Sequence, residues 1–124
     1  MIVTASGDES RAQALRNKGY EVLRVAVEPI KGKADLRSMM EALGSRELND
    51  ILVETGARLN GSLLQAGMVD EIISYIAPSV LGDMARGMFA IGELTTLEQR
   101  VKLEFTDVTP IGPDVRITAR VLNA

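Results

Sequence analysis

Residues 51–64, with the sequence ILVETGARLNGSLL, constrain the fold of this chain more than any other stretch. The run from Ile51 to Val53 is apolar and lies between two carboxylates, a pattern typical of a strand buried on both faces. Gly56 follows, and glycine allows a sharp turn between a strand and a helix. From Leu59 the apolar positions recur with helical spacing. The stretch therefore predicts a buried strand, a glycine turn and a helix.

The glycine turn gives the first functional expectation. Amide groups at the start of a helix have no partners within the helix, and the helix dipole is positive there, so an anion binds well. Glu54 stands at the end of the predicted strand, where open α/β sheets bind their ligands. Two interpretations of Glu54 follow. It contacts a ligand beside the turn, or it only caps a nearby loop or helix.

Strand and helix signals alternate along the rest of the chain. Acidic residues after Gly7 and a basic turn before Gly19 mark one helix. β-Branched alternation marks the strands, and apolar spacing marks the other helices. In order, we predict strands or helices at 1–7 (strand), 8–19 (helix), 20–27 (strand), 35–48 (helix), 51–53 (strand), 59–67 (helix), 72–77 (strand), 97–108 (strand) and 115–121 (strand), with a long loop at 79–96.

This order predicts the fold class. Strands that first alternate with helices and then follow one another indicate a mainly parallel sheet with an antiparallel edge hairpin. We therefore expect an α/β fold with three α/β/α layers, a mostly parallel sheet and an antiparallel C-terminal hairpin. A chain of 124 residues suffices for a single domain, residues 1–124, with a core of its own.

Composition excludes several functional classes. The chain has no histidine and no cysteine, so the usual zinc ligands, the usual general base near pH 7 and disulfides are all excluded. The net charge is −3 and there is no long basic run, so a nucleic-acid partner is not expected. No apolar run approaches the roughly 20 residues of a membrane helix, and we expect no charged-then-apolar leader in this sequence. We expect a cytoplasmic protein without a metal site.

Four sequence blocks carry a resemblance to a known family. They are VETG with NGSLL at 53–64, GMVDE at 67–71, IAPSVLG at 76–82 and GPDVR at 112–116. In this order and spacing they resemble the C-terminal reductase domain of the bifunctional riboflavin-biosynthesis deaminase/reductase, the RibD type, which is dihydrofolate-reductase-like. The similarity covers nearly the whole chain but only the later part of that domain. Because the chain opens abruptly in an apolar strand at Met1, we expect a longer parent protein. The resemblance to a bifunctional family implies that this parent can carry a zinc deaminase domain.

The resemblance implies an activity and a set of site residues. Family members reduce 5-amino-6-(5-phosphoribosylamino)uracil to the ribitylamino product with NADPH as hydride donor, and a homodimer is expected. Glu54 is at a substrate-contacting position, and Thr4 and Ser6 are at a nucleotide contact. No residue is implied as catalytic. The turn that cradles the NADPH phosphates is implied to comprise Gly56, Ala57, Arg58, Leu59, Asn60, Gly61 and Ser62.

Several of these residues have a second interpretation. Thr55 replaces a glycine that the family often has, and Arg58 replaces a small hydroxyl residue, so Arg58 is either a phosphate donor or solvated. A glycine inside a helix costs up to about 1 kcal/mol relative to alanine. Gly61 therefore has a reason connected with close packing or ligand approach. Thr4 and Ser6 are alternatively plain turn residues.

Other functional readings remain open. Without the earlier part of the domain, the isolated chain is expected to bind NADPH weakly and to turn over slowly or not at all. Alternatively, the chain is a non-catalytic module that dimerises through an apolar strand face. A generic nucleotide-binding α/β domain is a third and less favoured hypothesis, because no complete G-x-G-x-x-G motif is present. The proposed dimer face comprises Tyr75, Ile76, Val101, Leu103 and Phe105.

Overall fold

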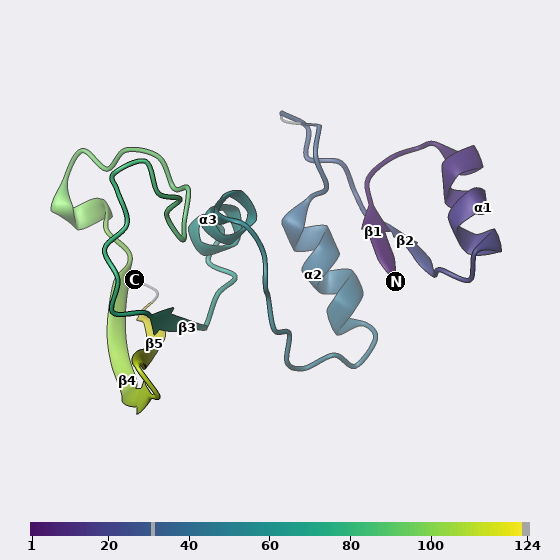
Figure 1. The fold of residues 1–124 in the computed structure, drawn as a ribbon. Coiled ribbons are helices and arrows are strands. Elements are labelled where there is room, and N and C mark those ends of the chain that lie inside the picture. Colours follow the sequence, from purple (N-terminus) through teal and green to yellow (C-terminus); the bar gives the residue numbers. More distant parts are fainter. Residues whose placement is uncertain (31, 123–124) are drawn as a thin grey trace. The chain divides into compact units, whose positions relative to one another are not determined.

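The computed structural model describes residues 1–30 and 32–122, and it confirms the α/β class (Figure 1). Contacts divide the chain into two compact units, Met1–Leu52 and Val53–Ala124. The first contains β1 (Ile2–Thr4), α1 (Glu9–Asn17), β2 (Val22–Arg24) and α2 (Leu36–Gly44). The second contains α3 (Ala57–Gln65), β3 (Glu71–Ile76), the 3₁₀ helix η1 (Leu97–Gln99), β4 (Lys102–Ile111) and β5 (Asp114–Leu122).

The first unit is a small β-α-β arrangement followed by a second helix. β1 and β2 are parallel neighbours and α1 connects them, as parallel strands require a crossover. The carboxylate of Asp8 caps α1 by accepting from the Arg11 amide at 3.0 Å. Asp35 caps α2 in the same way, accepting from the Ser38 amide at 2.7 Å. These caps satisfy amides that a helix leaves unpaired, which fixes where each helix begins.

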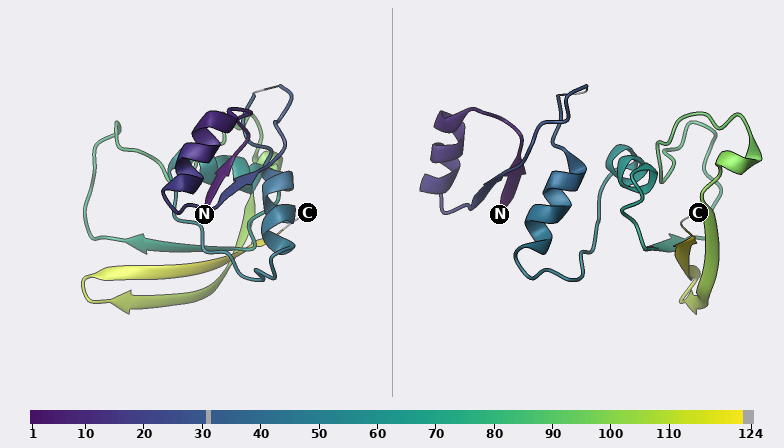
Figure 2. Two further views of the ribbon diagram at one scale, coloured as in Figure 1. Left: turned by 90° about the vertical axis from the view of Figure 1, so that its right-hand side faces the viewer. Right: turned by 180° about the vertical axis from the view of Figure 1, so that it is seen from behind.

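The second unit is built on an antiparallel sheet of order β3-β5-β4. β4 and β5 form the predicted C-terminal hairpin, and Gly112 occupies its turn with φ +59. The two long strands lie side by side in the left view of Figure 2. β4 is an outer strand of this sheet, and its register shifts between Phe105 and Asp107. Pro110 lies near its end, opposite Val115.

The prediction of a strand at residues 51–53 is wrong. In the described part of the chain these residues belong to no strand, and the exposed fractions of Ile51, Leu52 and Val53 are 38%, 78% and 41%. A strand needs a neighbouring strand to pair its amide and carbonyl groups, and an apolar pattern does not supply one. The described strands form a two-stranded parallel sheet in the first unit and a three-stranded antiparallel sheet in the second, and not the single, mostly parallel sheet that was predicted.

Other element boundaries differ more modestly from the prediction. α3 begins at Ala57 instead of Leu59, because Gly56 already serves as its N-cap. The strand predicted at 97–108 starts only at Lys102, since residues Leu97–Gln99 form η1. A reciprocal capping box between Thr96 and Gln99 holds that turn. The strand predicted at 20–27 is shorter, comprising only Val22–Arg24.

The hydrophobic core of the described residues is thin. Few apolar side chains are buried, and many large ones are exposed. None of the described helices has the length and apolar character needed to cross a membrane. Because so few apolar side chains are buried, each of them contributes a large share of the stability. The buried apolar residues are Ala12, Val25, Leu63, Leu64, Ala119 and Val121.

Candidate functional site

The start of α3 is open and lacks a side-chain cap. Gly56 is its N-cap residue with φ −86 and ψ 164, and no side chain of the described residues caps the helix. Its carbonyl accepts from the amides of Leu59 and Asn60, each at 3.1 Å. The amides of Ala57 and Arg58 come too early in the helix to have partners within it. A Cβ built on Gly56 meets no atom of a non-neighbouring residue within 4 Å, so no other described segment packs against this position.

Glu54 is exposed and lies two residues before the N-cap of α3. Within the described part of the chain, its carboxylate makes no hydrogen bond or ion pair, and it caps no helix. The alternative in which Glu54 caps a helix is therefore not observed. Arg58 is likewise exposed and without an ion pair to any described residue. Both charged groups are available to a ligand at the turn.

The interior glycine of α3 has a packing role. Gly61 is buried, and a Cβ there would lie 2.7 Å from the carbonyl carbon and 2.9 Å from the nitrogen of Ala90. Such approaches are shorter than real Cβ atoms show. The Ala90 amide also donates to the carbonyl of Ala57 at 2.9 Å. The backbone of the long loop therefore rests directly on α3, and the close-packing interpretation of Gly61 is confirmed.

Two side chains of α3 hold the same loop segment, residues 88–91. The Asn60 amide donates to the Met88 carbonyl at 3.2 Å, and the Gln65 amide donates to the Ile91 carbonyl at 2.8 Å. The sequence predicted a loop at 79–96 but not its attachment to α3. The helix-interior glycine was the signal that could have revealed it. Ser62 takes no part, because its hydroxyl donates to the Arg58 carbonyl at 2.9 Å.

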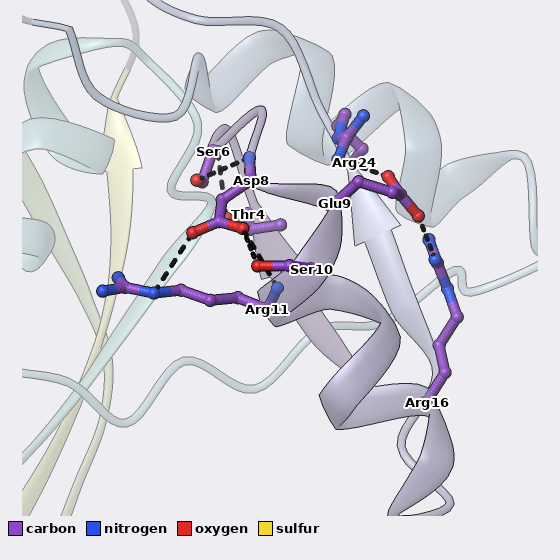
Figure 3. Close-up of polar contacts among 8 residues, drawn as sticks. All are labelled: Thr4, Ser6, Asp8, Glu9, Ser10, Arg11, Arg16 and Arg24. Carbon is purple, nitrogen blue, oxygen red and sulfur yellow. Dashed lines mark hydrogen bonds and ion pairs between the residues drawn. The ribbon is translucent and has the colours of Figure 1, made fainter.

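Thr4 and Ser6 form a chain of turn hydrogen bonds in the first unit (Figure 3). The Ser6 amide donates to the Thr4 hydroxyl at 3.0 Å, and the Asp8 amide donates to the Ser6 hydroxyl at 3.2 Å. Side chains that bond two residues onward are typical of turns. These two hydroxyls therefore guide the chain from β1 to the N-cap of α1. They belong to a different compact unit from Glu54 and the turn at Gly56.

Hydrogen bonds lower the pKa of several exposed carboxylates. The Arg11 amide lowers the pKa of Asp8, and the Arg16 guanidinium, with Arg24 further along, lowers the pKa of Glu9. Figure 3 shows both carboxylates with these partners. In the second unit the Arg116 guanidinium lies 3.0 Å from Asp107 and, together with the Thr109 hydroxyl, lowers the pKa of Asp107.

These shifts predict an acid-sensitive fold. A carboxylate whose native pKa is lowered stabilises the folded state fully above its unfolded pKa, near 4. That stabilisation is lost as the pH falls from there through the lowered native value. We expect the urea concentration at the unfolding midpoint to be constant from pH 7 to about pH 5. At pH values below about 4, this midpoint concentration should decrease. Asp107→Asn should lower the midpoint at pH 7 and reduce this fall, and an unchanged pH dependence would contradict the prediction.

Comparison with known proteins places the chain in a family. A model of the RibD C-terminal domain matches residues 1–117. The chain belongs to the RibD C-terminal domain family. It is 41% identical over 107 residues to the riboflavin biosynthesis protein RibD of Escherichia coli, covering 86% of this chain and 29% of that protein. It is 34% identical over 85 residues to the 5-amino-6-(5-phosphoribosylamino)uracil reductase of Buchnera aphidicola, covering 68% of this chain and 41% of that protein.

Solved structures support the same assignment. The RibD structure of Acinetobacter baumannii superposes with a TM-score of 0.73 at 31% identity, over 89% of this chain and 29% of that chain. A pyrimidine reductase-like protein of Corynebacterium diphtheriae reaches the same TM-score of 0.73 at 20% identity, which shows a shared fold, over 94% of this chain and 45% of that chain. The chain thus spans well under half the length of the RibD proteins that it matches.

Proposed function

We propose that this chain is part of a reductase that converts 5-amino-6-(5-phosphoribosylamino)uracil to its ribitylamino product with NADPH. The observation that carries the proposal is the uncapped start of α3, with open space at Gly56, in a chain of the RibD C-terminal domain family. Free amides at a positive helix end fit a phosphate group. The residues present therefore fit a phosphate-bearing cofactor.

Three residues at or beside the turn have defined parts in this proposal. The amides of Ala57 and Arg58 bind a cofactor phosphate, and the Arg58 guanidinium adds a charged donor. The Glu54 carboxylate accepts hydrogen bonds from hydroxyl or amino groups of the substrate. NADPH supplies the hydride when bound, so the protein needs to orient and polarise and does not need a histidine.

The proposal extends to the longer protein. We propose that in the full-length enzyme these elements contribute to a three-layer α/β/α domain, with a zinc deaminase domain on the same chain and a homodimeric assembly in the cytoplasm. The chain spans only 29% of the Escherichia coli RibD. We therefore expect it to bind NADPH weakly when isolated and to reduce the pyrimidine slowly or not at all.

NADPH fluorescence titration of the full chain tests the proposal. We expect weak saturable binding, which Gly56→Val weakens at least about tenfold, the equivalent of about 1.4 kcal/mol, because a side chain fills the open space beside the amides. Glu54→Ala should leave NADPH affinity unchanged, since Glu54 faces the substrate. Gly44→Val is a matched control, because a Cβ on Gly44 also meets nothing within 4 Å. Binding that survives Gly56→Val unchanged, or no binding by the unmodified chain, would refute the proposal.

A dimerisation module is the second candidate, favoured by exposed apolar residues on one sheet face. Pairing with Val115, Ala119 and Val121 of β5 places Ile76, Phe105 and Leu103 on one face, where 52%, 66% and 42% of their surfaces are exposed. Tyr75 pairs with Arg116 and therefore lies on the opposite face, which corrects the predicted set. A concentration-independent dimer in sedimentation, without NADPH binding, would favour this candidate.

A further inference from the structure

The side chain of Asn60 connects two segments that are far apart in the sequence. Its amide nitrogen donates to the carbonyl of Met88 at 3.2 Å and to the carbonyl of Thr55 at 3.4 Å. The Thr55 hydroxyl lies 3.1 Å from the Gly56 carbonyl and 3.3 Å from the amide oxygen of Asn60, and it donates its single proton to one or the other. We propose that Asn60 is a positioning residue that couples the turn at Thr55 and Gly56 to the loop segment 88–91.

The hydrogen-bonding capacity of Asn60 is used within the protein. Only an NH₂ group can donate to two carbonyls, so the amide orientation is fixed by its neighbours. Both hydrogens of the amide nitrogen have carbonyl acceptors within the protein, and Asn60 is half-buried. Asn60 therefore acts through the turn and does not bind the cofactor phosphate directly, which differs from the role that the resemblance implies.

Neighbouring backbone contacts join the same two segments. Gly61 lets the Ala90 backbone lie against α3, and the Ala90 amide donates to the Ala57 carbonyl at 2.9 Å. Ala57 is also the first residue of α3, whose own amide lies at the open helix end. A small shift of the loop therefore reaches the peptide groups at the start of the helix through direct contacts. Gln65 fixes the far end of the segment at Ile91.

Coupling of this kind has a reciprocal consequence. If the loop segment holds the turn in its open geometry, an anion bound at the turn must also favour the docked loop. The anion is the cofactor phosphate, and this part rests on the proposed function. The connection between turn and loop does not need the cofactor and can be measured without it.

Amide NMR of the full chain, without ligand, tests the connection. Asn60→Asp keeps the shape of the side chain but replaces two donors by an acceptor facing two carbonyls. We expect hydrogen exchange at the Ala90 amide to become at least about fivefold faster, as expected for the loss of an ordinary hydrogen bond. The Gly56 amide signal should shift as well. Exchange at the buried Leu64 should stay the same, which distinguishes positioning from general destabilisation.

Asn17→Asp is the matched control, because the Asn17 amide oxygen only accepts from Gln13 on α1, at 2.9 Å. It should leave both the Ala90 and the Gly56 signals unchanged. The proposal is overturned if Asn60→Asp alters neither signal or only one of them, or if Leu64 exchanges faster to the same extent. Absence of NADPH binding by the unmodified chain would count against the proposed function alone, since this readout uses no cofactor.

Hydrogen exchange in the presence of NADPH tests whether the turn and the loop segment 88–91 are coupled to cofactor binding. In the unmodified chain, saturating NADPH should slow exchange at Ala90, and in Asn60→Asp this slowing should disappear. NADPH that binds without affecting Ala90 would overturn the coupling while leaving the proposed function intact. NADPH that slows Ala90 equally in both proteins would also overturn it, since Asn60 would then be dispensable.

Discussion

Gly61→Ala is expected to destabilise the second unit, although alanine is the better helix former. A Cβ at Gly61 would lie within 3 Å of backbone atoms of Ala90, which cannot move aside as a flexible side chain can. Overpacking costs about 1–3 kcal/mol, and alanine recovers up to about 1 kcal/mol in helix propensity. We expect a net loss of about 1–2 kcal/mol in the free energy of unfolding, measured by urea denaturation followed by circular dichroism.

Gly44→Ala is the matched control for this prediction. Gly44 also lies in a helix, at the end of α2, and a Cβ there meets nothing within 4 Å. Alanine should therefore leave the stability unchanged or raise it slightly. Equal effects of the two substitutions would show that the loop backbone does not rest on Gly61.

Leu63→Ala is expected to have the largest effect on stability. Only 3% of the Leu63 surface is exposed, and the described residues contain few other buried apolar side chains. Removing a buried leucine side chain costs about 2–5 kcal/mol, a large fraction of the roughly 5–15 kcal/mol that stabilises a typical domain. We expect a loss of about 3 kcal/mol by urea denaturation.

Leu59→Ala provides the comparison within the same helix. Leu59 lies one turn before Leu63 in α3, and 39% of its surface is exposed. Helix propensity changes identically in the two variants, so the difference between them reports burial alone. We expect a loss of about 1 kcal/mol for Leu59→Ala, because only part of its side chain is covered. A loss as large as that of Leu63→Ala would mean that another surface covers Leu59 in solution.

Helix positions could be predicted from the sequence because their signals are local. Asp8 and Asp35 stand immediately before α1 and α2 and cap them through their own side chains. Gly19 and Gly67 adopt φ +84 and +65 just after α1 and α3, a conformation that glycine favours. Each of these interactions spans only a few residues. The sequence alone therefore locates them.

The strand predicted at 51–53 failed because pairing is not local. Its apolar residues satisfy the pattern of a buried strand, but the described chain supplies no neighbouring strand. The same limit applies to the site. The glycine turn and the start of α3 could be predicted, whereas the contacts of Asn60 with Met88 and of Gly61 with Ala90 could not. These contacts join residues about 28 positions apart, and no short pattern records them.

The outer edge of β4 has a consequence for self-association. An outer strand of ten residues exposes a row of backbone groups to which a strand of another molecule can add, a common start of aggregation. In β4 the register shift between Phe105 and Asp107 interrupts this row, and Pro110 removes a donor near its end. Lys102 places a charge at its beginning. The bulge and Pro110 therefore divide the edge into short stretches that hinder strand addition, and variants that straighten the bulge or replace Pro110 should precipitate more readily.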